Sequence, residues 1–100
     1  MAPISPYLDQ IIALCHVNHV KELAVFGSIL TSKYSENSDI DFIVEFEQLE
    51  PLQYADCYFR LKFALEDLFH RPIDLLERKA VRNPFLLSEI ESTKQLLYAA

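Results

Sequence analysis

The fold of this chain is decided by Val25-Phe26-Gly27-Ser28 and by Ser38-Asp39-Ile40-Asp41-Phe42-Ile43-Val44, which begins ten residues after Ser28. Gly27 is the only glycine, and it separates an apolar run from the expected start of a helix. A lone glycine there indicates a sharp backbone turn or a close approach to another group. Asp39 and Asp41 are two residues apart on a strand-like segment, so both side chains point to one side. A turn with free N–H groups beside two acids predicts chemistry on a metal and a phosphate.

The composition predicts one small folded domain spanning residues 1–100. Hydrophobic residues make up 51% of the chain, which suffices for one core but not for two. The net charge of −6 argues against a general nucleic-acid binder, which normally has a basic face. No leader-like segment and no apolar run near the roughly 18 residues of a membrane span are present. The chain is therefore expected in the cytoplasm, with Cys15 and Cys57 as buried thiols in a reducing compartment.

Apolar periodicity predicts helices and strands in the order α-β-α-β-α-β-α. Helices are expected over 5–18, 29–34 and 51–70, with a last amphipathic helix from Asn83-Pro84 to Leu97. Strands are expected over 21–26, 39–46 and 72–76. Because residues 42–44 are all apolar, the second strand is predicted to be covered on both faces. The order gives an α/β (α+β) fold with a small three-stranded sheet packed with helices.

Three aspartates are candidate metal ligands. Asp39 and Asp41 begin a strand, and Asp74 interrupts an apolar segment, where an unpaired charge is costly. Two carboxylates ~4 Å apart repel by about 1 kcal/mol in water and about 4 kcal/mol at an effective dielectric of 20. A proton or a cation must relieve this repulsion, and all-oxygen donors favour Mg²⁺ or Mn²⁺. Gly27 and Ser28 add backbone N–H groups and a hydroxyl that suit a triphosphate.

Each feature alone has a simpler interpretation. Gly-Ser is common in ordinary turns, Asp-x-Asp is common in solvated turns, and Asp74 could form an ion pair with Arg71 or Arg78. The order and spacing of the three features together favour the metal–triphosphate site.

This joint pattern resembles the nucleotidyltransferase family of the DNA polymerase β superfold, and most closely its minimal (MNT) domains, which act as antitoxins to HEPN toxins. The resemblance covers nearly the whole chain, through Phe26-Gly27-Ser28, Ser38 to Phe46, Ile73-Asp74-Leu75 and the Arg82-Asn83-Pro84 helix. It implies a polymerase β-like fold with a mixed sheet. It also implies that the metal ligands are Asp39, Asp41 and Asp74, that Asp74 helps to activate the attacking hydroxyl, and that Gly27 and Ser28 hold the triphosphate.

The reaction implied by the resemblance is AMPylation, the transfer of AMP from ATP to a hydroxyl with release of pyrophosphate. The implied partner is a helical HEPN-type toxin, an RNase that is silenced when its tyrosine is adenylylated. This chain would then be the antitoxin of a toxin–antitoxin pair.

One stretch departs from the family pattern. Many relatives follow Gly-Ser with a sequence like Arg-Ala-Arg-Gly, whereas this chain has Ile29-Leu30-Thr31-Ser32. The change removes charge-assisted phosphate contacts and leaves Lys33 as the nearby cation. Low ATP affinity is the expected consequence.

Three other functions stay open. An antitoxin that acts by binding alone is favoured by the missing arginines and disfavoured by the intact aspartates. Nucleotide transfer to tRNA 3′ ends needs a basic groove, which the acidic charge disfavours. The last is a small α/β domain with an incidental acid cluster. Gly27→Val is expected to abolish nucleotide binding while sparing the metal held by the aspartates.

Overall fold

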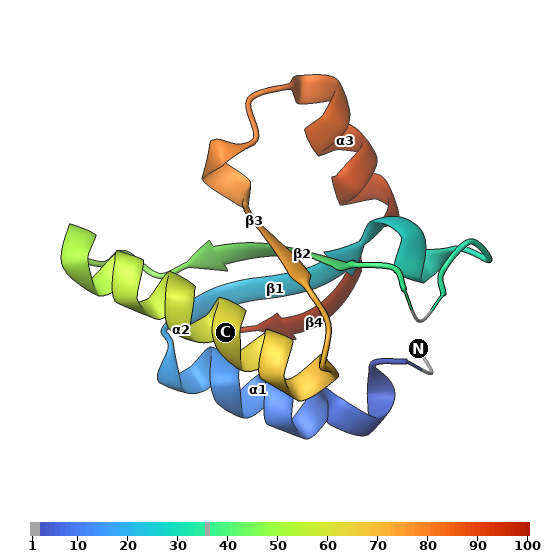
Figure 1. The fold of residues 1–100 in the computed structure, drawn as a ribbon. Helices are drawn as coiled ribbons and strands as arrows, with labels where there is room; N and C mark the ends of the chain where they lie inside the picture. Colours follow the sequence, from blue (N-terminus) through green and yellow to red (C-terminus); the bar gives the residue numbers. More distant parts are fainter. Residues whose placement is uncertain (1–2, 36) are drawn as a thin grey trace.

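The computed structural model describes residues 3–35 and 37–100. Its centre is a four-stranded mixed sheet in the order β3-β2-β1-β4 (Figure 1). The strands are β1 (Val20–Phe26), β2 (Ile40–Phe46), β3 (Ile73–Glu77) and β4 (Gln95–Ala99). β1 pairs antiparallel with both β2 and β4, and β2 pairs parallel with β3. A parallel pair needs a crossover connection, and the long helix between β2 and β3 supplies it.

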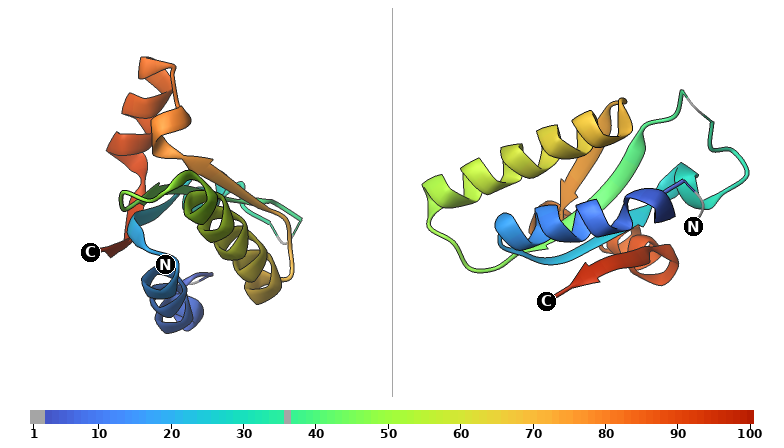
Figure 2. Two further views of the ribbon diagram at one scale, coloured as in Figure 1. Left: turned by 90° about the vertical axis from the view of Figure 1, so that its left-hand side faces the viewer. Right: turned by 90° about the horizontal axis from the view of Figure 1, so that it is seen from below.

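Three helices cover the two faces of the sheet. α1 (Leu8–Val17), preceded by a 3-10 turn, and α2 (Pro51–Phe69) lie on one face, while α3 (Pro84–Thr93) lies on the other (Figures 1 and 2). Pro51 and Pro84 occupy the first turns, where proline is pre-organised for a helix. The Asn83 side chain caps α3 by accepting the backbone N–H groups of Phe85 and Leu86.

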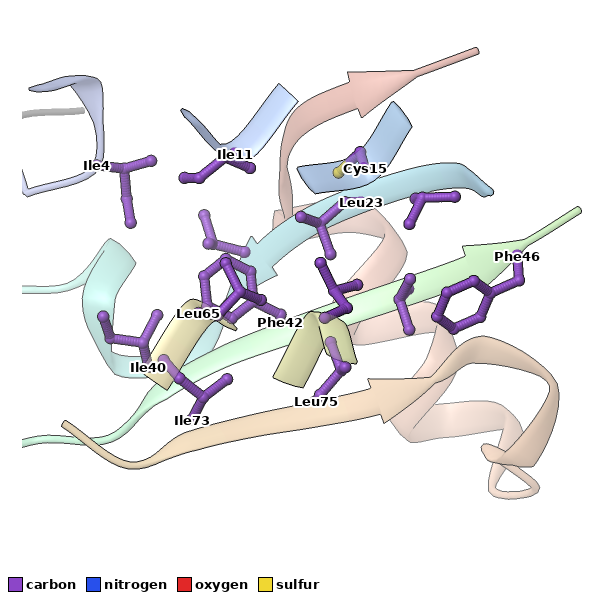
Figure 3. Close-up of a cluster of buried hydrophobic side chains, with 14 of the residues drawn as sticks. Ile4, Ile11, Cys15, Leu23, Ile40, Phe42, Phe46, Leu65, Ile73 and Leu75 are labelled. Carbon is purple, nitrogen blue, oxygen red and sulfur yellow. The ribbon is translucent and has the colours of Figure 1, made fainter. Parts of the chain in front are cut away.

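The main core lies between the sheet and the α1–α2 layer. Figure 3 shows its buried side chains, among them Ile11, Leu23, Phe42, Leu65 and Leu75. A smaller cluster of Ala24, Ile43 and Ile90 packs α3 against the opposite face. Phe42, Ile43 and Val44 are at most 4% exposed, which confirms that β2 is covered on both faces. Cys15 and Cys57 are buried free thiols, and burial raises the pKa of Cys15 to about 12.

The C-terminal segment differs from the sequence prediction. α3 ends at Thr93, and residues 95–99 form β4 instead of continuing the helix to Leu97. The sheet therefore has four strands, not three. Lys94 turns the chain into extended backbone, and β4 then satisfies the free edge of β1, with Leu23 opposite Tyr98 and Val25 opposite Gln95. Strand pairing outweighs the helix-like spacing of the leucines because it satisfies backbone groups that β1 would otherwise leave open.

The helix expected over 29–34 is also wrong. The chain forms a 3-10 turn over Gly27–Leu30 and then becomes extended at Thr31. The Thr31 hydroxyl and N–H both donate to the Ser28 carbonyl, each at 2.9 Å. This local bond closes the turn and competes with continuation of the helix.

A chain of ion pairs fastens α3 to the sheet. Arg78 Nε lies 2.9 Å from Glu91 Oε1, and Lys94 Nζ lies 2.8 Å from Glu91 Oε2 and 3.0 Å from Glu22 Oε2. The network links the end of β3, through α3, to β1. Over the part of the chain that the structure describes, no helix has the length and apolarity that a bilayer crossing requires.

Candidate functional site

The parallel register of β2 and β3 places Asp41 and Asp74 side by side. Asp41 is the partner of Asp74, between the pairs Ile40–Ile73 and Phe42–Leu75. Those neighbouring pairs point into the main core, so the two aspartates point to the α3 face. Asp39 precedes β2 by one residue and shares the side of Asp41. The three predicted acids therefore lie on one face of the sheet, where β2 and β3 begin, near enough for Asp39 and Asp74 to act on the charge of Asp41.

Gly27 brings the end of β1 against these acids. It follows Phe26, which is the β-sheet partner of Asp41, and has a φ of +78°. A Cβ atom at Gly27 would lie 2.4 Å from Asp41 Oδ2, closer than two such atoms can approach. Glycine is required here both by backbone conformation and by space. This confirms the turn and the close approach that the sequence predicts.

The same contact changes what Gly27→Val is expected to do. A valine at position 27 would push against the Asp41 carboxylate. The substitution is therefore expected to weaken a metal held by Asp41 together with nucleotide binding, instead of sparing the metal.

The three carboxylates repel one another when no cation is bound between them. Burial raises the pKa of Asp41, and the negative charges of Asp74 and Asp39 raise it further. Asp41 is half-buried, whereas Asp39 and Asp74 are exposed. A cation between the carboxylates would remove this repulsion.

The donor set fits a metal that binds together with phosphate. Within residues 3–35 and 37–100, no three His, Cys, Asp or Glu side chains are gathered closely enough to enclose a metal by themselves. Mg²⁺ is usually held by one or two carboxylates, waters and substrate phosphates rather than by an all-protein cage. The oxygen donors of Asp39, Asp41 and Asp74 match that mode and suit Mg²⁺ or Mn²⁺.

The turn after β1 is the candidate phosphate site. Ser28 is half-buried, and the exposed Lys33 follows in the loop, where its backbone N–H donates to Thr31 Oγ1 at 3.2 Å. The four-residue 3-10 turn is too short to develop a helix macrodipole. Phosphate binding would depend on local N–H groups, the Ser28 hydroxyl and a nearby cation.

A groove between this turn and α3 adjoins the site at Gly27. It encloses about 490 Å³ and is lined by Phe26, Gly27, Leu30, Thr31, Leu86, Glu89, Ile90 and Thr93. The sequence does not indicate the contribution of α3, because α3 is distant along the chain and its apolar spacing predicts only a core-facing surface. The 45% exposure of Leu86 shows that part of this stripe is left open.

Arg71 has other partners than the ion pair with Asp74 that the sequence allows. Its Nη1 donates to the Tyr34 hydroxyl and, at 3.3 Å each, to the carbonyls of Ser35 and Ser38. Among the described residues, Asp74 pairs with neither Arg71 nor Arg78, since Arg78 binds Glu91. Arg71 instead ties the loop before Asp39 to the start of β3.

Comparisons with known proteins agree with this geometry. A model of the nucleotidyltransferase domain family matches residues 9–97. A relative from Methanocaldococcus jannaschii named "Putative protein adenylyltransferase" is 38% identical over 79 residues, which cover 79% of this chain and 76% of the relative.

Two solved structures share the fold. One, described as a "putative minimal nucleotidyltransferase", has a TM-score of 0.77 and 26% identity, and the match covers 92% of this chain and 90% of that one. The other, a complex of tri-AMPylated Shewanella oneidensis HEPN toxin with MNT antitoxin, has a TM-score of 0.65 and 18% identity over 96% and 72% of the two chains. The chain belongs to the nucleotidyltransferase domain family and has the fold of its minimal members.

Proposed function

We propose that this protein is a metal-dependent protein adenylyltransferase that moves AMP from ATP to a hydroxyl of a partner protein. The observation that carries the proposal is the contact of the Gly27 turn with Asp41, beside Asp74, in a nucleotidyltransferase domain. Phosphate-binding N–H groups and paired carboxylates are the two halves of such a site.

Each residue has a stated part in this proposal. Asp39, Asp41 and Asp74 would hold Mg²⁺ or Mn²⁺, which supplies charge stabilisation to the phosphoryl oxygens when bound. The N–H groups at Gly27 and Ser28, with the Ser28 hydroxyl, would bind the triphosphate, and Lys33 would add a positive charge.

The bond changes follow from this placement. The acceptor oxygen forms a bond to the α-phosphorus, and the bond from that phosphorus to the bridging oxygen breaks, so that pyrophosphate leaves. The acceptor proton passes to the Asp74 carboxylate, which is exposed and open to a protein-borne hydroxyl.

The groove beside α3 would receive the nucleoside. Leu30, Leu86 and Ile90 offer apolar contacts to a base, and Glu89 can accept a hydrogen bond from an exocyclic amine such as that of adenine. The groove begins at Gly27, so a nucleoside placed there has its phosphates at the turn.

The proposed acceptor is a HEPN-type helical toxin, with this chain as the antitoxin of a toxin–antitoxin pair. Support comes from the structural neighbour in which an AMPylated HEPN toxin is bound to an MNT antitoxin. The family membership of this chain supports the same reaction class.

The direct test is label transfer from α-³²P-ATP, with Mg²⁺, to a co-purified HEPN partner. Asp41→Asn is expected to lower transfer by at least about 10²-fold, the scale on which catalytic acid–base and electrostatic groups act. Glu47→Gln, which removes an exposed carboxylate beyond β2, is the matched control and should transfer normally. Equal transfer by the wild type and Asp41→Asn would contradict the proposal.

A second candidate function is neutralisation of the partner by binding alone. It is favoured by the turn itself, because Ile29 is buried and no cation lies within Gly27–Leu30 to meet the phosphates. This alternative would be selected if the wild type neutralised the partner without transferring label to it, and if Asp41→Asn neutralised the partner equally well.

A further inference from the structure

A separate cleft lies between α2 and the outer edge of β3. It encloses about 420 Å³, and Tyr54, Tyr58, Phe59 and Glu77 are among its lining residues. None of its lining residues belongs to the groove at Gly27. β3 is an outer strand of the sheet, so the cleft opens along an edge that a partner can reach.

The aromatic wall of this cleft is held in place before any ligand binds. The Tyr58 hydroxyl donates to the Leu75 carbonyl at 2.6 Å, which fixes the ring over the strand edge. The rings of Tyr58 and Phe59 meet edge to face with their centroids 5.2 Å apart, and Phe59 stacks on Phe63 with a centroid separation of 6.0 Å. Fixed aromatic faces attract a cation by their negative charge density.

One carboxylate oxygen in this cleft has no partner. Glu77 Oε1 is buried and accepts no hydrogen bond from the described residues. The cation next to it in sequence, Arg78, is already bound to Glu91 at 2.9 Å. A buried acceptor left open in this way is costly, and a positively charged donor entering the cleft would satisfy it.

The hydroxyls of Tyr54 and Tyr58 do not neutralise the negative charge of the Glu77 carboxylate. Burial, the charge of Glu77 and a hydrogen bond to the Glu77 carboxylate raise the pKa of Tyr54 to about 12, so the open acceptor is the Oε1 atom of Glu77 and not the whole carboxylate. Burial and the charges of Asp74 and Glu77 also raise the pKa of Tyr58. Both hydroxyls therefore stay neutral, and the field in the cleft is negative.

The cleft adjoins an exposed apolar stripe on α2. Leu52, Phe59 and Phe63 are 83%, 50% and 57% exposed, and their spacing along α2 puts them on one side of the helix. Phe59 belongs both to this stripe and to the cleft wall. An exposed apolar stripe that continues into a charged pocket is typical of an interface with a central anchor residue.

We propose that this cleft binds an arginine side chain of the acceptor protein, with the guanidinium against Glu77 and between the aromatic rings. Arginine is favoured over lysine because its planar group stacks on aromatic faces while donating to a carboxylate. The identity of the bound protein as the acceptor rests on the proposed function. Glu77 is three residues after Asp74 on β3, about 10 Å along the strand, and its side chain points to the α2 face while that of Asp74 points to the α3 face. An acceptor held in the cleft would therefore reach Asp74 around the outer edge of β3.

The first experiment uses the intact protein and two small probes. N-acetyl-arginine methylamide is titrated into the ¹⁵N-labelled chain and compared with N-acetyl-citrulline methylamide, its neutral counterpart. We expect saturable shifts at Tyr54, Tyr58 and Glu77 with the arginine probe only. Glu77→Gln should weaken its affinity by at least about tenfold, whereas Glu47→Gln should not. Equal shifts with citrulline, or undiminished binding by Glu77→Gln, would overturn the inference.

The second experiment separates this inference from the proposed function. With the HEPN partner as acceptor, Glu77→Gln should raise the KM for the acceptor about tenfold and leave kcat and ATP affinity unchanged. Urea unfolding confirms that the variant is folded. Arginine binding without any label transfer by the wild type would retain the cleft and reject the transferase. Label transfer with an unchanged KM in Glu77→Gln would reject the cleft alone.

Discussion

At the scale of single residues, Gly27 and Asp41 constrain each other. The positive φ of Gly27 and the close approach of its missing Cβ to Asp41 Oδ2 make any side chain at position 27 unfavourable. The turn can therefore lie against the carboxylate that burial and its acidic neighbours make prone to protonation. The closeness of the candidate phosphate site to the candidate metal site depends on this one absent side chain.

Gly27→Ala tests that constraint. The left-handed backbone and the contact with Asp41 should lower the free energy of unfolding by about 1–2 kcal/mol, and the displaced carboxylate should weaken Mg²⁺–ATP binding. Urea unfolding and isothermal titration measure the two effects. Ser28→Ala is the control for the fold, since the bonds that close the turn use the Ser28 carbonyl rather than its side chain. Native nucleotide affinity in Gly27→Ala would show that the contact is irrelevant to binding.

Arg71 positions Asp39 through the loop that precedes it. Arg71→Ala removes its bonds to Tyr34, Ser35 and Ser38 and should cost about 1 kcal/mol of stability. Hydrogen exchange should accelerate in the segment before Asp39, and ATP affinity should fall. Arg71→Lys should not restore slow exchange, because one ammonium cannot reproduce the planar fork. Restoration by lysine would indicate that only the positive charge matters.

At the scale of elements, α3 is the piece that turns an open sheet face into a groove. Only Ile90 of this helix is buried, so its attachment depends on the ion pairs of Arg78, Glu91, Lys94 and Glu22 as well as on the small apolar cluster. Shared ion pairs stabilise more than isolated surface pairs when several charges are held together. The groove beside Gly27 and this network therefore depend on the same helix.

The pH dependence of stability should report on this network. Hydrogen bonds from Lys94 and then from Arg78 lower the pKa of Glu91 below its ordinary value of 4.5. Because the folded pKa is the lower one, this stabilisation is present above pH 4.5 and is lost as the pH falls through the folded pKa. Glu91→Gln should thus lower the Tm at pH 7 and converge with the wild type in acid. If the Tm values of the wild type and Glu91→Gln differed by the same amount across pH 3–7, the ion-pair network would not be the cause of the difference in stability.

At the scale of the whole molecule, the candidate site joins parts from the entire chain. The turn after β1, the starts of β2 and β3, and the face of α3 all border it. A ligand bound there contacts only the folded state and so must stabilise the molecule by mass action.

Thermal unfolding with a non-hydrolysable ATP analogue tests this coupling. With Mg²⁺ and the analogue at 100 times its Kd, the folded state should gain about 2.7 kcal/mol, and EDTA should remove most of the shift in Tm.

Asp41→Asn should change the Tm of the free protein and also remove the Mg²⁺-dependent shift. Loss of a carboxylate whose folded pKa is raised should increase its Tm without ligand at pH 7, a gain that disappears below pH 3.8. The Mg²⁺-dependent shift should be absent in this variant, and its persistence would place the metal elsewhere.

Much of the fold is predictable from the sequence because its cues are local. Pro51 and Asn83-Pro84 mark helix starts, the apolar run Phe42–Val44 marks a strand buried on two sides, and lone Gly27 marks the turn. The C-terminal strand is not predictable in this way. Leu96 and Leu97 continue a helical spacing, and only the open edge of β1 selects strand over helix.

The sequence by itself determined the class of fold and the glycine turn, and it identified the three acids as candidates. These features follow from side-chain periodicity and backbone freedom within a few residues. The tertiary structure alone decided that Asp41 and Asp74 are register partners, that α3 forms the wall of a groove, and that Arg71 ties down the loop before Asp39. It also decided that Glu77 Oε1, among aromatic rings, accepts no hydrogen bond from the described residues. Each of those contacts joins residues that are distant along the chain. Their meeting depends on strand order and helix packing, which no local pattern contains.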